Sequence, residues 1–175
     1  MSAFLPSPEQ GQLIEATARA VAGRFPATRL VERGAAGVPN RDAEQWPLIC
    51  ELEWPGLMLP AAAGGSGCSL MDLAYVHREL ARGLLTPTLL ATMLAARLSA
   101  AAGDAALARA LAGGAARAAC AIPLPGGAGW YLLQAEQCTH ALSWDEGAAT
   151  LVELRHYREL RDCEAIEDSL GLQQI

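Results

Sequence analysis

The chain has 175 residues, which is enough for one domain with a real core plus a small appendage but too few for two full domains. Hydrophobic residues make up 52 % of it and aromatic residues only 5 %, because alanine and leucine carry the apolar content, so we expect a closely packed helical core. The net charge is −6 and the 13 basic residues are all arginines, with no basic patch interleaved with aromatic side chains, which argues against a nucleic-acid partner.

The first predicted helix begins after Ser7. Ser7 is a suitable N-cap, Pro8 fits the first turn, where its missing N–H costs nothing, and Gln10 is placed to close a capping box. A second helix is predicted over 42–53, where Pro47 removes a backbone donor and should cause a late start or a kink. The residues that we expect these two helices to bury are Ile14, Ala18, Val21, Phe25, Trp46, Ile49 and Leu52.

A glycine-rich loop and a capped amphipathic helix follow. Residues 61–67 (AAAGGSG) should form a loop, because three glycines in four positions do not hold a regular element cheaply. Ser69 and Asp72 predict the capped start of the third helix. Its apolar face is predicted to consist of Leu70, Leu73, His77, Leu80 and Leu84, with Tyr75, Arg78, Glu79 and Arg82 lying elsewhere.

Two more helices and a change to strands complete the chain. Thr86 and Pro87 begin a fourth helix over 89–101, and Gly103-Asp104 opens a short fifth one that turns Leu107 and Leu111 inward. Short apolar runs at 118–124, 130–135, 140–144 and 149–154, separated by turn residues, predict a small antiparallel sheet. In the tail, alternation around 157–163 favours a strand, whereas Leu160, Cys163, Ile166 and Leu170 have a loose helical spacing.

The compartment is predicted to be the cytoplasm. The five cysteines are an odd number without a CxxC pair, and the first residues (MSAFLPSPEQ) lack the basic start and apolar run of a secretory signal. The apolar stretch 84–102 is about as long as a membrane span, but it contains Pro87, Arg97 and several hydroxyl groups, so we expect a buried helix and no membrane contact.

The side chains that could carry chemistry have plainer explanations. We expect Glu51, Glu53 and Glu79 to lie on solvated helix faces, because nothing marks an apolar pocket around them. His77 is expected to be a hydrogen-bonded core or interface residue. The GGSG loop is expected to be a tight lead into the next helix, because no Lys-Ser/Thr follows it as in a phosphate-binding loop. No metal site and no Cys–His nucleophile pair is predicted from the scattered residues Cys138, His140 and Cys163.

The order of these elements resembles the N-terminal half of the acyl-CoA dehydrogenase family. The resemblance is carried by 56–60 (GLMLP), 64–67 (GGSG), 79–83 (ELARG) and the Thr-Pro pair that follows. Residues 1–115 are similar to the family's N-terminal helical domain and 116–175 to a shortened form of its middle β domain. The predicted fold class is therefore α+β, mainly helical with a small antiparallel β appendage.

The resemblance implies chemistry with flavin adenine dinucleotide (FAD), in which a carboxylate removes the α-proton of an acyl-CoA thioester while the β-hydrogen leaves as hydride to the flavin. In the family, the catalytic glutamate and much of the flavin contact belong to a C-terminal helical bundle. The chain stops at Ile175, where that bundle would begin, so we expect no catalytic residue here and a dehydrogenase-like partner chain in a homo- or hetero-oligomer.

The same resemblance points to three candidate cofactor-binding residues, Ile122, Pro123 and Leu124. They belong to the segment 122–127 (IPLPGG), which stands where family members carry a Thr-Glu-Pro sequence and a glycine-rich turn that contact the flavin. Pro123 replaces the hydroxyl residue and has no N–H to donate. Two hypotheses remain open: a subunit or partial chain of a flavin-dependent acyl-CoA dehydrogenase that uses a partner for flavin and base, or a non-catalytic interaction module derived from that family.

Overall fold

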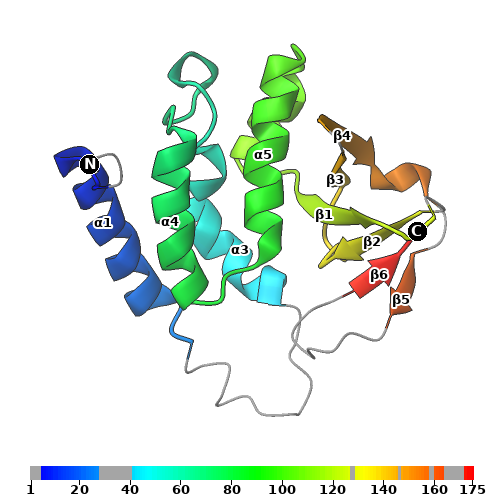
Figure 1. Ribbon diagram of the computed structural model, residues 1–175, viewed down its shortest axis with the longest axis horizontal. Coiled ribbons are helices and arrows are strands. Elements are labelled where there is room, and N and C mark those ends of the chain that lie inside the picture. The colour runs from blue at the N-terminus through cyan, green and yellow to red at the C-terminus, as the bar shows by residue number, and fades with distance from the viewer. Residues whose placement is uncertain (1–4, 28–40, 127–128, 146, 158–159, 164–171) are drawn as a thin grey trace.

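A computed structural model describes residues 5–27, 41–126, 129–145, 147–157, 160–163 and 172–175, with the helices on one side and the sheet on the other (Figure 1). The helices are α1 (Pro8–Arg24), α3 (Arg41–Glu51), α4 (Leu70–Arg82), α5 (Pro87–Ala101) and α6 (Ala105–Ala112), with 3₁₀ turns η1 (Trp54–Gly56), η2 (Ala61–Ala63) and η3 (Leu154–His156). The strands are β1 (Ala118–Pro123), β2 (Trp130–Leu133), β3 (His140–Asp145), β4 (Ala148–Glu153), β5 (Arg161–Cys163) and β6 (Leu172–Gln174).

Both predicted capping boxes are confirmed. The Ser7 hydroxyl accepts the Gln10 N–H at 3.2 Å and the Gln10 side chain accepts the Ser7 N–H at 3.0 Å. At α4, Ser69 and Asp72 make the same reciprocal pair at 3.2 and 2.8 Å. The Gln10 side-chain amide also donates to Asp72 at 2.8 Å, so the cap of α4 fastens the first turn of α1 to it.

Helix α3 differs from its prediction. It begins at Arg41 and ends at Glu51, so the late start expected from Pro47 is wrong and the proline lies inside the helix. Trp46 and Ile49 are 2 % and 0 % exposed, and this burial offsets the backbone hydrogen bond that a proline removes. The packing of these two side chains therefore stabilises a helix that contains a proline.

The buried side of α4 is rotated relative to the predicted one. Leu73 and Leu80 are buried as predicted, and Val76 joins them at 0 % exposure. Leu70, which was expected on the same inner face, is 73 % exposed. Leu84, also expected there, is 51 % exposed because it lies beyond the end of α4 at Arg82, with φ 50°. The reason is that α4 packs against α1 and the segment after α3, which cover only part of its apolar surface. Leu70 is therefore left facing outward.

Helix α5 joins the helices to the sheet. Alanines at 91, 95 and 96 are buried, and their small side chains let α6 and β1 approach closely. The Thr92 hydroxyl accepts the N–H of Ala118, the first residue of β1, at 3.0 Å. The predicted helices over 89–101 and after Gly103 are confirmed as α5 and α6. Within the described parts of the chain, no helix has the length and hydropathy needed to cross a bilayer.

The sheet has the strand order β4-β3-β1-β2-β6-β5. The four strands predicted over 118–154 and the tail strand are confirmed, whereas the helical alternative for the tail rests on Ile166 and Leu170, which lie outside the described residues. The expectation of a purely antiparallel sheet is wrong at one place, because β1 and β3 pair in parallel. After β2 the chain crosses to the other edge of β1, where β3 runs in the same direction as β1.

The C-terminal residues form a strand, β6, that pairs with β2. Trp130 and Ile175 exchange backbone hydrogen bonds at 2.9 and 3.1 Å, which places β6 between β2 and β5. Gly129, at φ 150°, has no room for a side chain, because a Cβ there would lie 2.1 Å from the Ile175 carbonyl oxygen. The division at residue 115 falls between α6 and β1 and stays a prediction.

Candidate functional site

The three residues predicted to contact flavin lie at the end of β1. Pairing of β1 with β3 ends at Ala121 and Ser143, whereas Ile122 and Pro123 still pair with β2. Ile122 is 45 % exposed, Pro123 is exposed and Leu124 is half-buried. The structure therefore brings the three together at an open end of the sheet, on the side where β3 no longer covers β1.

The backbone of these three residues offers no donor to the open side. The Leu124 N–H donates to the Gly129 carbonyl at 2.9 Å, on the β2 side. Because backbone N–H groups alternate between the two neighbours of a strand, Ile122 also faces β2 and only Pro123 faces the open side. Proline has no N–H, and none of the three side chains carries a hydroxyl. These residues do not fit the hydrogen-bonding role toward FAD that the family resemblance implied.

What this end of the sheet does present is apolar surface. Ile122 and Trp144 each stand one residue beyond the last β1–β3 pair, and they are 45 % and 52 % exposed. An exposed tryptophan beside an exposed isoleucine is typical of a contact surface rather than of a polar binding site.

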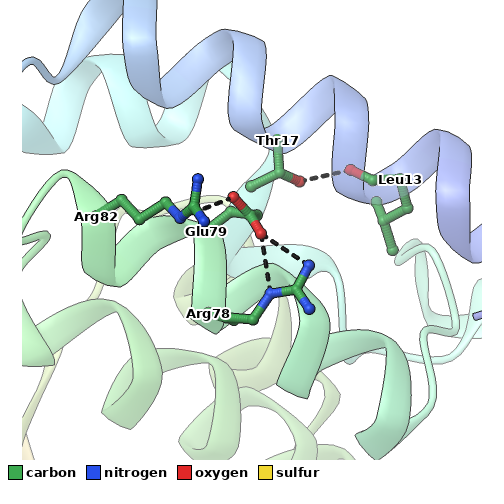
Figure 2. A network of polar contacts seen from close by, with 5 residues as sticks. All are labelled: Leu13, Thr17, Arg78, Glu79 and Arg82. Carbon is green, nitrogen blue, oxygen red and sulfur yellow. Dashed lines mark hydrogen bonds and ion pairs between the residues drawn. The ribbon is translucent and has the colours of Figure 1, made fainter. Parts of the chain in front are cut away.

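The prediction that Glu79 lies on a solvated face is wrong. Its side chain is 4 % exposed, because α1 covers this side of α4, and Figure 2 shows it beside Thr17 of α1. Arg78 reaches one carboxylate oxygen with Nε and Nη2, both at 2.9 Å, and Arg82 reaches the other with Nε at 3.4 Å. No sequence signal shows this burial, since Glu with Arg at i−1 and i+3 is also the pattern of an exposed ion pair.

None of the three glutamates is placed as a general base. Both oxygens of Glu79 are occupied by guanidinium groups, whereas a base must approach the substrate proton. Glu51 is 58 % exposed and pairs with Arg24 at 2.8 Å, as a solvated helix face predicts. Glu53 is exposed just before η1.

The histidine and cysteine candidates do not converge. His140 lies on β3 and Cys163 on β5, with β1, β2 and β6 between them in the sheet. Within the described residues, no three His, Cys, Asp or Glu side chains gather as metal ligands would. All five cysteines are free thiols.

His77 is half-buried, and its Nε2 atom is inaccessible and has no hydrogen-bond partner among the described residues. Burial lowers the pKa of this imidazole below its usual value. The residue lines a cavity of about 140 Å³ at the turn between α4 and α5. His77 was expected to be a hydrogen-bonded core or interface residue, and its Nε2 atom does not make that hydrogen bond within the described residues.

The glycine-rich loop borders a separate cavity of about 450 Å³, lined among others by Cys50, Ser66 and Arg109. Its amides are already used: the N–H groups of residues 65, 66 and 67 donate to carbonyls of residues 60, 56 and 59. Gly65 is required there, because a Cβ would lie 2.2 Å from the Leu59 carbonyl oxygen. The loop thus packs on itself and presents no nest of free N–H groups to a phosphate.

The comparison with protein families identifies the class. Residues 7–118, well over half of the chain, match the acyl-CoA dehydrogenase N-terminal domain, and the chain belongs to the acyl-CoA dehydrogenase family. This agrees with the resemblance read from the GLMLP, GGSG and ELARG segments.

Particular relatives are similar over part of their length. The acyl-CoA dehydrogenase IpdE2 of Mycobacterium tuberculosis is 34 % identical over 89 residues, which are 50 % of this chain and 28 % of IpdE2. The fold is similar to that of the ChsE4-ChsE5 complex from M. tuberculosis, with a TM-score of 0.73, 14 % identity, and coverage of 98 % of this chain and 54 % of the other.

A glutaryl-CoA dehydrogenase from Mycobacterium smegmatis in complex with FADH₂ has a TM-score of 0.70 and 14 % identity, over 96 % of this chain and 52 % of its own. The chain thus spans about half the length of these solved relatives and less than a third of IpdE2.

Proposed function

We propose that the chain is one part of a flavin-dependent acyl-CoA dehydrogenase, which removes the α and β hydrogens of an acyl-CoA thioester, and that a dehydrogenase-like partner chain supplies the flavin and the catalytic base. The observation that carries this proposal is the match of residues 7–118 to the family's N-terminal domain. The names of the relatives support it, since one is an acyl-CoA dehydrogenase and another is a complex of two differently named chains. A cytoplasmic location is proposed with it, supported by five unbridged cysteines.

The need for a partner follows from what the described residues lack. The end of β1 offers no hydroxyl and no free N–H to FAD, and the buried Glu79 carboxylate is occupied by two arginines. The contribution of this chain is structural: α4 and α5 form a helical wall, and the Thr92–Ala118 hydrogen bond fixes that wall to the sheet. Residues 1–115 and 116–175 are proposed to act as the two domains of this scaffold.

Co-expression tests the proposal. The chain is produced with each dehydrogenase-like chain encoded beside it, and the purified product is examined for flavin absorbance and for acyl-CoA-dependent reduction of an electron acceptor. We expect a yellow, active hetero-oligomer. The proposal is wrong if the chain stays monomeric and colourless and binds neither flavin nor acyl-CoA when mixed with those candidates.

The second candidate function is a non-catalytic interaction module that keeps the fold. It is favoured by one observation: at the end of β1, Ile122 and Pro123 provide neither a hydroxyl group nor an N–H to the open side. The two functions differ in one measurement on the purified complex. If the partner chain oxidises acyl-CoA equally fast with and without this chain, the interaction module is the correct description.

A further inference from the structure

The cavity of about 450 Å³ beside the glycine-rich loop has an apolar floor and a charged rim. Leu59, which is 1 % exposed, and the small side chains of Ala63 and Ala112 line it, and the exposed residues Glu53 and Arg109 line it as well. Its volume lies within the range of about 300–1,000 Å³ that is usual for small-molecule sites. Every described residue that lines it precedes β1, so it is separate from the end of β1.

The two charged side chains at the rim have opposite signs and do not pair. Neither Glu53 nor Arg109 takes part in an ion pair within the described part of the chain, whereas Glu51 and Glu79 each contact an arginine. Glu53 also has a left-handed backbone, with φ 56°, an unfavourable conformation for a residue with a side chain and one that is concentrated at functional sites. A carboxylate and a guanidinium group that border one cavity can bind a ligand with two opposite charges.

The end of α6 adds a hydrogen-bond acceptor to the cavity. A helix leaves its last four carbonyl groups without partners inside the helix. Here the N–H groups of residues 113, 116 and 114 donate to the carbonyls of residues 109, 110 and 111, respectively, but no hydrogen bond between described residues reaches the Ala112 carbonyl. The Ala112 oxygen lies beside Gly56 of the cavity wall, since a Cβ on that glycine would be 3.6 Å from it. This acceptor, at the negative end of the helix, favours a cationic donor.

A ligand with a single charge suits this cavity less well than one with two. An anion would pair with Arg109 but would meet the Glu53 carboxylate and the negative end of α6, and a cation would be repelled by Arg109. A phosphate group finds no amide donors in the glycine-rich loop, because the loop's N–H groups at residues 64–67 already donate to carbonyls nearby. A small zwitterion satisfies both charges.

We propose that the cavity binds a small zwitterion of the α-amino-acid class. The carboxylate of the ligand pairs with Arg109, and its ammonium group donates to Glu53 and to the Ala112 carbonyl. A short apolar side chain lies against Leu59. The Ser66 hydroxyl also lines the cavity and can donate a hydrogen bond to the ligand's carboxylate. The inference does not depend on the proposed function.

Calorimetric titration of the full-length chain with L-leucine tests the site. Isocaproate lacks the ammonium group of leucine and isoamylamine lacks its carboxylate, so the three probes separate the two charges. We expect leucine to bind at least about tenfold more tightly than either analogue. Arg109→Gln and Glu53→Gln should each raise the Kd of leucine about tenfold or more, whereas Arg19→Gln, at a 74 % exposed position of α1, is the matched control and should leave it unchanged.

A second measurement reports where leucine binds. The Trp46 indole N–H donates to the Gly114 carbonyl at 3.0 Å, next to Gly113 of the cavity wall, so its NMR signal should shift when leucine is added. Both glutamine variants change exposed side chains, and their circular dichroism should match that of the unchanged chain. The inference is overturned if about 10 mM leucine produces neither heat nor a shift of this signal. It is also overturned if either analogue binds as tightly as leucine, or if both variants bind leucine like the unchanged chain.

Discussion

Replacing Glu79 with glutamine tests how much the buried carboxylate between α1 and α4 contributes to the stability of the fold. The change keeps the shape of the side chain but removes its charge. One carboxylate oxygen becomes an amide N–H₂ group, so the guanidinium group facing it loses its acceptor and meets another donor. A hydrogen bond to a charged group contributes about 1.5–3 kcal/mol. Arg78 and Arg82 are more than half exposed. Water therefore screens their ion pairs with Glu79 in the unchanged chain and solvates both guanidinium groups in the variant, which reduces the loss.

We therefore expect a loss of about 1.5 kcal/mol for Glu79→Gln, at the lower end of that range, and a melting temperature lower by about 3–6 °C for a chain of this length. Glu79→Leu is expected to lose less than about 1 kcal/mol, because the leucine packs against apolar residues at the end of α1 and just after it. These residues, including Val21 and Phe25, line the adjoining cavity of about 280 Å³.

Urea unfolding followed by circular dichroism measures these differences. Glu15→Gln on α1 is the matched control, since Glu15 is 73 % exposed and lies 3.6 Å from Arg19, and it should leave the unfolding midpoint unchanged. The reasoning is refuted if Glu79→Gln unfolds at the same urea concentration as the unchanged chain, or if the leucine variant is less stable than the glutamine variant.

Three further predictions follow from local geometry. Gly129→Ala should cost about 2 kcal/mol or more and expose the Trp130 amide to hydrogen exchange, because the new Cβ meets the backbone of Ile175; Gly126→Ala, with open space around it, should cost about 1 kcal/mol. Burial lowers the pKa of His77, so the folded state binds fewer protons than the unfolded one: stability is full above the usual histidine pKa and falls as the pH drops through it. Urea midpoints at neutral and mildly acidic pH should show this loss, and His77→Leu should reduce it. Ser69→Ala should cost about 1 kcal/mol in urea unfolding, and no loss would contradict its capping role.

Local signals in the sequence determined where most elements lie. The capping boxes at Ser7 and Ser69 act between residues three positions apart, so their outcome does not depend on the rest of the molecule. The strands follow from short apolar runs between turn residues, and the GLMLP and GGSG segments sufficed to identify the family. The end of β1 was also predictable in one respect, because Pro123 cannot donate a hydrogen bond in any fold.

Tertiary structure decided what each face of those elements meets. The sequence of a helix shows which residues share a face but not which face a neighbour covers. The packing of α1 against α4 therefore decides that Glu79 is buried and Leu70 exposed. The parallel β1–β3 pair and the insertion of β6 beside β2 join residues far apart in the chain, which no local pattern specifies. The burial of His77 Nε2, which has no hydrogen-bond partner in the described part of the chain, and the cavity beside it likewise arise from contacts between α4 and the start of α5. Burial is a property of the assembled fold rather than of any one segment.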